Sequence, residues 1–223
     1  MAATLTVLEL PNLFALLEQV QRAGDAEATI NLATSPYSLL QNAGKPRLLE
    51  RVGQVRDGAA AALGESWNHA RLDAQRSLIE QQLDGGRLRE AFEGAQAWSG
   101  ARIAGEKAYS GADYDLAGAC FLLARVLDKT GGSEQALPLL DEARKRSEAI
   151  ERDRPGFGGE RMVSVCITER ADCLRHLGRL DEAAAAYEES IRHADKLGDD
   201  RGVAVGKTQL GTAACSSAAI KRR

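Results

Sequence analysis

A short phrase that recurs at long intervals constrains this chain more than any other feature. It reads Gly-Arg-Leu-Asp-Glu-Ala from residue 178 and Gly-Arg-Leu-Arg-Glu-Ala from residue 86, and a looser copy begins at Gly132. In each copy a glycine ends one helical pattern and an alanine lies on the next. These alanines are 45 and 47 residues apart: Ala91, Ala136 and Ala183. Recurrence at a nearly regular period is the signature of a repeat array, in which each unit packs on its neighbours.

Between the glycine turns, apolar residues recur with helical spacing. Aromatic residues make up only 4% of the chain, which suits helices packed through small side chains better than sheets. No strand-like alternation bounded by hairpin signals occurs. We therefore expect an all-α fold of antiparallel helix pairs joined by short turns. The expected helices begin near residues 11, 26, 46, 66, 88, 112, 133, 160, 180 and 201.

The chain divides into three expected parts. Residues 1–24 form an extension and a leading helix, residues 25–215 the helical-repeat domain, and residues 216–223 a frayed tail. We also expect fraying at residues 1–7 and a kink at Pro36, within a helix that reaches Ala43, because a proline inside a helix removes a hydrogen bond. The last repeat is incomplete, since its second helix is missing.

The recurring positions resemble those of the tetratricopeptide repeat (TPR). In that family, small and large residues on a first helix are followed by an alanine, a large residue and a second small residue on the next. Aligned on Ala183, the matching positions are Ala171, Leu174, Gly178, Tyr187 and Ser190; aligned on Ala136, they are Ala124, Leu127, Leu140 and Ala143. The resemblance covers most of residues 25–215. It implies a right-handed α-solenoid, the TPR-like superhelix.

The period departs from the family standard of roughly 34 residues, and the signature tryptophan and terminal proline are mostly absent. Such long repeats are similar to the TPR arrays of bacterial signalling proteins, in which the array follows an NB-ARC-like nucleotide-binding module. The segment from Glu9 to Leu17 is similar to the junction where those arrays begin. This resemblance implies a sensor or scaffold portion whose nucleotide-binding module is absent from the chain.

Composition and short motifs argue against several other classes of protein. The formal net charge is −3, which provides no strong attraction to nucleic acid or to a membrane surface. No signal peptide is recognisable, and no apolar run approaches the roughly 18 residues of a membrane span. We expect a cytoplasmic protein with reduced thiols. Its four cysteines form no CxxC pair and are interpreted as buried apolar residues: Cys120, Cys166, Cys173 and Cys215.

Two stretches suggest chemistry but fit it poorly. The segment Gly202–Thr208 has three residues between its glycines, whereas a phosphate-binding P-loop has four and follows a strand. His176 and Cys173 are three apart, yet a zinc site needs further ligands, so His176 is interpreted as solvent-facing. We expect no catalytic, cofactor-binding or metal-binding residues, although an enzyme with an unrecognised site stays an open alternative.

The resemblance implies that partners bind the concave face, which the first helix of each pair lines. The candidate groove residues are polar and of mixed sign, with one aromatic: Asn31, Thr34, Ser38 and Gln41, then Asp73, Arg76 and Glu80, then Phe121, Arg125 and Asp128, and finally Thr168, Asp172 and Arg175, with Thr208 ending the row. Arginine can bind carboxylates through two hydrogen bonds, and an aromatic ring can anchor an interface. An ordinary soluble surface is the alternative interpretation of the same residues.

These patterns predict a non-enzymatic scaffold that binds a protein or peptide in the groove, without nucleic acid or membrane. The alternative is the sensor or regulatory fragment of a nucleotide-dependent signalling protein of the NB-ARC type. The incomplete last repeat also suggests self-association through Val205, Leu210 and their neighbours, because terminal repeats normally need a polar cap.

Overall fold

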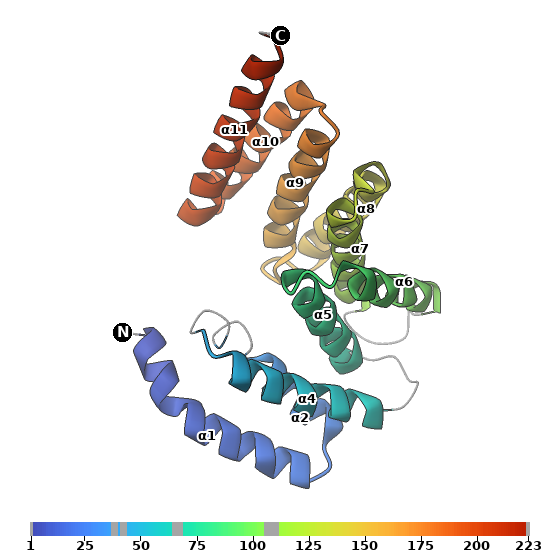
Figure 1. Ribbon diagram of the computed structural model, residues 1–223, viewed down its shortest axis with the longest axis vertical. Helices are drawn as coiled ribbons and strands as arrows, with labels where there is room; N and C mark the ends of the chain where they lie inside the picture. Colours follow the sequence, from blue (N-terminus) through green and yellow to red (C-terminus); the bar gives the residue numbers. More distant parts are fainter. Residues whose placement is uncertain (1, 37–39, 41–43, 64–68, 105–111, 222–223) are drawn as a thin grey trace. The chain divides into compact units, whose positions relative to one another are not determined.

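The computed structural model of the chain is helical, as Figure 1 shows. It describes residues 2–36, 40, 44–63, 69–104 and 112–221, and within these ranges it contains α-helices and no strand. The helices are α1 (Ala2–Arg22), α2 (Ala26–Thr34), α4 (Pro46–Ala62), α5 (His69–Asp84), α6 (Leu88–Ala104), α7 (Ala112–Lys129), α8 (Ser133–Asp153), α9 (Gly159–His176), α10 (Leu180–Lys196) and α11 (Asp200–Lys221). The prediction of an all-α fold is confirmed.

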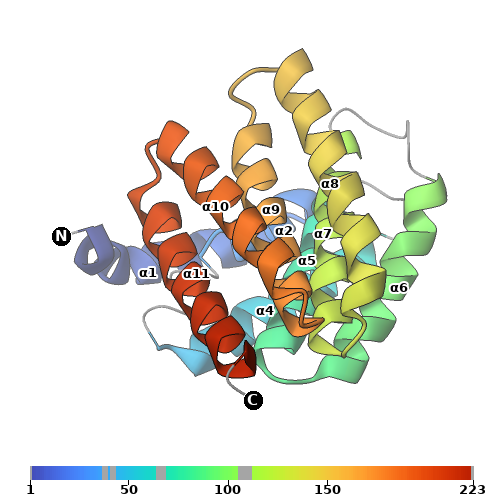
Figure 2. The ribbon, with the colours of Figure 1, turned by 90° about the horizontal axis from the view of Figure 1, so that it is seen from above.

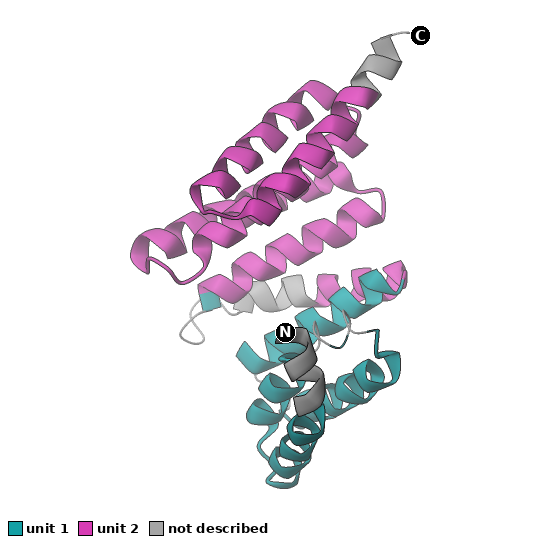
Figure 3. Ribbon diagram, turned by 90° about the vertical axis from the view of Figure 1, so that its left-hand side faces the viewer, with its two compact units in different colours: residues 1–85, 107–112 teal, residues 86–106, 113–223 magenta. Residues whose placement is uncertain are grey.

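The chain forms two compact units (Figure 3). Unit 1 comprises residues 1–85 and 107–112, and unit 2 comprises residues 86–106 and 113–223. All three copies of the recurring phrase fall in unit 2. The expected division into residues 1–24, 25–215 and 216–223 stays a prediction.

Unit 1 packs α1, α2, α4 and α5 around two groups of apolar side chains. One group is centred on the buried residues Leu17, Ala33, Leu40 and Val52. The other joins Ile30 to Ala70 and Ala74. Asp25 caps α2, because its side chain accepts a hydrogen bond from the Ala28 amide at 3.0 Å.

Unit 2 is built on the repeat positions. Its α8, α9, α10 and α11 pack in succession, each helix on the next (Figure 2). The three recurring alanines, Ala91, Ala136 and Ala183, are fully buried. Two of them belong to a core that also contains Leu140, Leu174 and Tyr187. Small residues at these positions let the helices approach closely, while the large residues fill the space between them.

The φ angles of the turn glycines change the alignment of the looser copy of the recurring phrase. Gly86 and Gly178, each five residues before its alanine, have φ angles of 72° and 74°. Before Ala136 the equivalent residue is Gly131, with φ of 88°, and not Gly132 as the looser copy suggested. Only glycine adopts this left-handed conformation without strain, so Gly131 is the structural counterpart of Gly178.

Three helix ends differ from the expectation. α1 begins at Ala2 and contains Pro11, which was expected to start it. α2 ends at Thr34, shortly before Pro36, which has no N–H to donate. The Leu40 amide bonds to the Pro36 carbonyl at 2.9 Å. The expected kinked continuation to Ala43 falls mostly on residues 37–39 and 41–43, which lie outside the described residues. α11 continues to Lys221, through residues for which fraying was expected. Residues 216–221 contain neither glycine nor proline, and two alanines favour the helix.

Candidate functional site

The described groove residues of unit 1 lie on α2 and α5. Asn31 is exposed on α2, and the Thr34 hydroxyl donates to the Ile30 carbonyl of the same helix at 2.9 Å. On α5, Asp73 and Arg76 form an ion pair within the helix, and Glu80 is half-buried. Ser38 and Gln41 lie outside the described residues. The hydrogen bond of Thr34 and the ion pair between Asp73 and Arg76 each lie within one helix.

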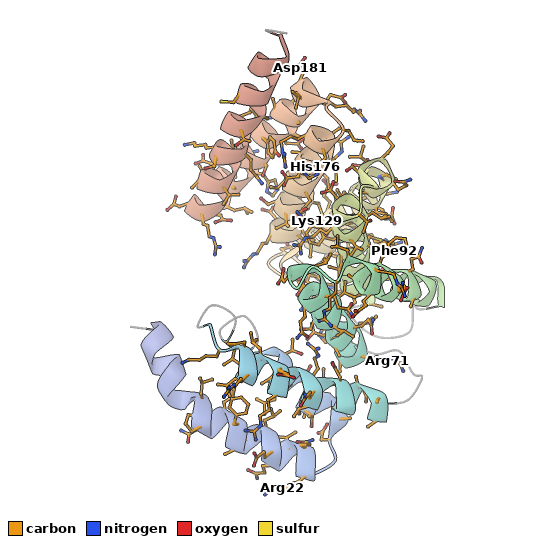
Figure 4. The ribbon with its side chains drawn as sticks, in the orientation of Figure 1. Arg22, Arg71, Phe92, Lys129, His176 and Asp181 are labelled. Carbon is orange, nitrogen blue, oxygen red and sulfur yellow. The ribbon has the colours of Figure 1, made fainter. Side chains whose placement is uncertain are left out.

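In unit 2, several of the predicted groove residues bond to side chains from other helices. We call this set the unit 2 polar network, and it consists of Asp128, Ser133, Asp172, Arg175, His176, Tyr187 and Gln209. Its members come from α7, α8, α9, α10 and α11, and three of them lie on α9, where Figure 4 labels His176. The network is therefore a tertiary feature of unit 2.

Asp128 is the buried end of this network, with a side chain only 4% exposed. The Ser133 hydroxyl donates to one of its oxygens at 2.7 Å, and Nδ1 of His176 lies 2.9 and 3.0 Å from the two oxygens. Burial alone would raise the pKa of this carboxyl, but the bonds from His176 and Ser133 outweigh burial and lower the pKa. Asp128 therefore holds His176 in place as an ionised acceptor.

Asp172 joins the other helices of the network. The Tyr187 hydroxyl of α10 donates to Oδ1 of Asp172 at 2.6 Å, and the Gln209 amide of α11 donates to Oδ2 at 3.1 Å. Arg175 donates from Nη2 to Asp172 and from Nε to the Tyr187 hydroxyl, each at 3.3 Å. Burial and the bond to Asp172 raise the pKa of Tyr187, so the phenol stays a neutral donor.

A second ion pair connects α7 and α9 beside the network. Nε of Arg125 lies 3.4 Å from a Glu169 oxygen, and the Arg125 guanidinium lies 5.8 Å from the centre of the Phe121 ring. A cation over an aromatic ring at this distance is attracted to the ring face. Burial raises the pKa of Glu169, although the charge of Arg125 opposes this shift. Phe121 itself packs against the core of unit 2 and is partly buried.

The hydroxyls of Thr168 and Thr208, the last two predicted groove residues, have different partners. The Thr168 hydroxyl lies 2.6 Å from the Ser190 hydroxyl of α10 and 3.1 Å from the Ser164 carbonyl. Thr208 is exposed on α11, and its hydroxyl donates to the Ala204 carbonyl at 3.0 Å. Of the two, only Thr168 contacts another helix through its hydroxyl.

Five participating residues were missed as candidates: Ser133, Glu169, His176, Tyr187 and Gln209. His176 was interpreted as solvent-facing, and its side chain is 36% exposed, but its Nδ1 also bonds to a buried carboxylate. Tyr187 was assigned only to packing, although its hydroxyl reaches Asp172. One signal in the sequence could have predicted the contact between Asp128 and His176: the repeat alignment places both residues near the ends of successive first helices. Residues at such equivalent ends are expected to be neighbours in a stacked array.

The stretch that was compared with a P-loop is accounted for by helix packing. Gly202–Thr208 lies inside α11, and a Cβ at Gly206 would lie 2.7 Å from an Ile191 side-chain atom, so this glycine permits close contact with α10. All four cysteines are free thiols, three of them buried as expected, while Cys215 is exposed.

A pocket of about 470 Å³ also lies in unit 2, between α8, the start of α9 and His193 of α10. Glu151 fixes the adjoining loop, because its two oxygens accept from the Gly156 amide at 2.6 Å and the Glu160 amide at 3.3 Å. The charged lining is mixed, and Arg144 is already bound to Glu148 and Glu189. This lining favours no single ligand class, and Glu151 serves to shape the entry into α9.

The Asp128–His176 pair resembles the way an acid orients a catalytic histidine, but here Nε2 contacts Arg175 and not a nucleophile. Among the described residues, no group of three or more histidine, cysteine, aspartate or glutamate side chains could hold a metal ion. No described helix combines the length and the apolar character needed to cross a membrane. In comparisons with known proteins, no protein-family model matches the chain, and no curated protein matches it either.

Proposed function

We propose that this chain is a non-enzymatic scaffold that binds a protein or peptide segment. Its helices would form antiparallel pairs in a right-handed, TPR-like solenoid, and the face built by α7 and α9 would be part of the concave binding surface. The burial of Ala91, Ala136 and Ala183 at equivalent positions supports the repeat assignment. The network that spans α7 to α11 supports the choice of face, because it fixes polar side chains on successive helices.

One observation carries the proposal. The side chains of Arg125 and Arg175 are 29% and 30% exposed, and each is held by a carboxylate of α9. The contact of Arg125 with Glu169 is made through Nε, and the bonds of Arg175 to Asp172, Tyr187 and His176 are made through Nη2 and Nε. A guanidinium that is already ordered loses little conformational freedom when a partner accepts from its remaining N–H groups.

The binding mechanism would be the display of such ordered donors beside the partly buried Phe121 ring. A partner would have to present hydrogen-bond acceptors, because an arginine has only donors. Exposed charged groups then set the association rate and the specificity, while the ring supplies apolar contact area. No bond is made or broken in this proposal.

The decisive experiment compares Arg125→Glu and Arg175→Glu with Arg192→Glu in affinity capture from the native lysate. Arg192 lies on α10, is 65% exposed and has only a 4.0 Å pair with Glu188, so it controls for surface charge. Circular dichroism and denaturation must show that each variant is folded, since both groove arginines also bond within unit 2. We expect partners retained by Arg192→Glu to be lost from the other two. If both groove variants keep every partner, the proposal is wrong.

The repeat period favours a second candidate function. Spacings of 45 and 47 residues are similar to those of arrays in NB-ARC-linked signalling proteins, which points to a sensor fragment of a nucleotide-dependent switch. Sequencing the DNA upstream of Met1 tests this candidate. An in-frame module with a P-loop would favour it, and an unrelated gene would count against it.

Self-association through α11 is a further part of the proposal. Val205 is 44% exposed and available for contact, whereas Leu210 packs against the core of unit 2 and is not freely available. Light scattering over a concentration series tests this part, with Val205→Lys as the variant. A native chain that stays monomeric at high concentration would exclude it.

A further inference from the structure

The contacts of His176 determine where its proton lies. Nε2 of His176 is 2.9 Å from Nη2 of Arg175. A guanidinium can only donate hydrogen bonds, so Nε2 must accept and carries no proton. The ring proton is therefore on Nδ1, which faces both oxygens of Asp128 at 2.9 and 3.0 Å. The contacts describe a neutral histidine whose second nitrogen is in use as an acceptor.

The groups on the two sides of the His176 ring carry opposite charges. Asp128 faces it from α7, and that carboxylate also accepts from Ser133 at the start of α8 and contacts the Cys173 thiol. Arg175 faces the ring from α9. Behind Arg175 are Asp172 of α9 and Tyr187 of α10, with Gln209 of α11 on the other oxygen of Asp172. A negative charge thus meets Nδ1 and a positive charge meets Nε2.

The two neighbours of the ring are not equally fixed. The Asp128 side chain is 4% exposed and is bonded from two sides. Arg175 is 30% exposed, and its bonds to Asp172 and Tyr187 are both 3.3 Å long, near the outer limit for such contacts. If the ring changes its charge, Arg175 is therefore the group that moves.

We propose that protonation of His176 is a switch that releases Arg175 from the unit 2 polar network. The proton comes from solvent and binds Nε2, which becomes a donor facing the donors of Arg175. Two positive charges then meet where one hydrogen bond existed. The imidazolium stays on Asp128, since a bond between two charged groups is stronger than the bond to a neutral ring. The guanidinium leaves the ring, and its terminal N–H groups become available.

The effect of this switch on partner binding rests on the proposed function. Histidine is the side chain whose charge ordinarily changes between about pH 5 and 8. A partner that accepts from Arg175 no longer competes with Nε2 once the ring is protonated. Its affinity is therefore expected to rise at least about fivefold between pH 8 and pH 6, the lower end of typical coupling between sites.

Nuclear magnetic resonance of the full ¹⁵N-labelled chain tests the switch without any partner. At high pH, the ring nitrogens of His176 are expected to report a proton on Nδ1 and none on Nε2. As pH falls, the Nε resonance of Arg175 is expected to shift with the same midpoint as the ring. Arg125 and His193 in the same spectra are internal controls, because neither contacts this pair. A proton on Nε2 at high pH overturns the proposal, and so does an Arg175 Nε resonance that does not shift with the midpoint of the His176 ring.

His176→Gln is the matched variant, since an amide can accept from Arg175 and donate to Asp128 but cannot gain a charge in this range. The Arg175 shift is expected to disappear in this variant while the fold is retained. If a partner is captured, its affinity should depend on pH in the native chain and not in His176→Gln. A pH-independent affinity overturns the regulatory role, whereas failure to capture any partner overturns only the proposed function.

Discussion

Each unit joins two helices through a side-chain pair that contains a carboxylate, and the two pairs differ in burial. In unit 1, Arg51 of α4 lies 2.6 Å from Glu18 of α1, and the side chains are 53% and 45% exposed. In unit 2, His176 of α9 lies 2.9 Å from Asp128 of α7, and the aspartate is 4% exposed. Water competes for the first pair and salt screens it, so it contributes little to stability. In the second pair the carboxylate is buried and also accepts from Ser133, so this pair specifies one geometry.

One glycine from each unit differs in a similar way. Gly58 of α4 in unit 1 has open space where a Cβ would be, whereas Gly159 at the start of α9 has none. A Cβ at Gly159 would lie 2.5 Å from the Ser147 carbonyl oxygen and 2.8 Å from the Glu151 Cβ. The close approach of α8 and α9 depends on the missing side chain. In unit 2 the polar contacts and the helix spacing are therefore both closely fitted.

Gly159→Ala is the substitution expected to have the largest effect on this contrast. The added Cβ must push α8 and α9 apart, and overpacking of this kind costs about 3 kcal/mol. Gly58→Ala is the matched control and is expected to stabilise the chain by roughly 0.5–1 kcal/mol, because alanine is the better helix former. Urea denaturation of both variants measures the free energy of unfolding. Equal effects at the two positions would show that unit 2 is no more tightly fitted than α4.

Asp128→Asn tests the buried pair through its pH dependence. At neutral pH the loss of a charged hydrogen-bond acceptor is expected to cost roughly 2 kcal/mol. The pKa of Asp128 is lowered from 3.8 by His176 and Ser133 against the effect of burial. A carboxyl with a lowered folded pKa stabilises the fold above its unfolded pKa, and this contribution is lost as pH falls through the folded pKa. The native chain should therefore lose it below about pH 4.

Denaturation from pH 7 to pH 2.5 measures this difference. The Asp128→Asn chain is expected to lack that part of the acid dependence, whereas Asp195→Asn, at an exposed position on α10, should follow the native curve. If the free energy of unfolding falls equally in acid for the native chain and for Asp128→Asn, the ionised Asp128 carboxylate does not contribute to stability.

Glu18→Gln tests the exposed pair and is expected to have the smallest effect. Removing the carboxylate charge should cost roughly 0.5 kcal/mol or less, while Arg51 keeps its contact with the Phe14 ring at 5.1 Å. The difference from the native chain should vanish in 1 M salt, where charges are screened within a few ångströms. A salt-independent loss as large as that of Asp128→Asn would remove the distinction between the units.

The interiors of the helices could be predicted from the sequence because their signals are local. Glycine turns such as Gly178 and the spacing of apolar residues place α7 to α10 within two residues of the structure. The end of α2 at Thr34 could not be predicted, because a proline such as Pro36 can either kink a helix or end it. The unit 2 polar network was not predicted: its members Asp128, Asp172 and Arg175 were candidates for a binding groove, which stays a prediction. Their bonds to His176, Tyr187 and Gln209 join positions 48, 12 to 15 and 37 residues apart, and periodicity along one helix does not encode such pairings.

The burial of the thiols has a practical consequence. The thiolate is the reactive form of cysteine, and burial raises the pKa of Cys166 to about 12 and also raises that of Cys173. Cys120 is buried as well, so Cys215 on α11 is the exposed one of the four. A maleimide at neutral pH is therefore expected to attach one probe per chain, at a native residue. Such a probe reports on α11, the helix that carries Gln209, and it requires no engineered cysteine.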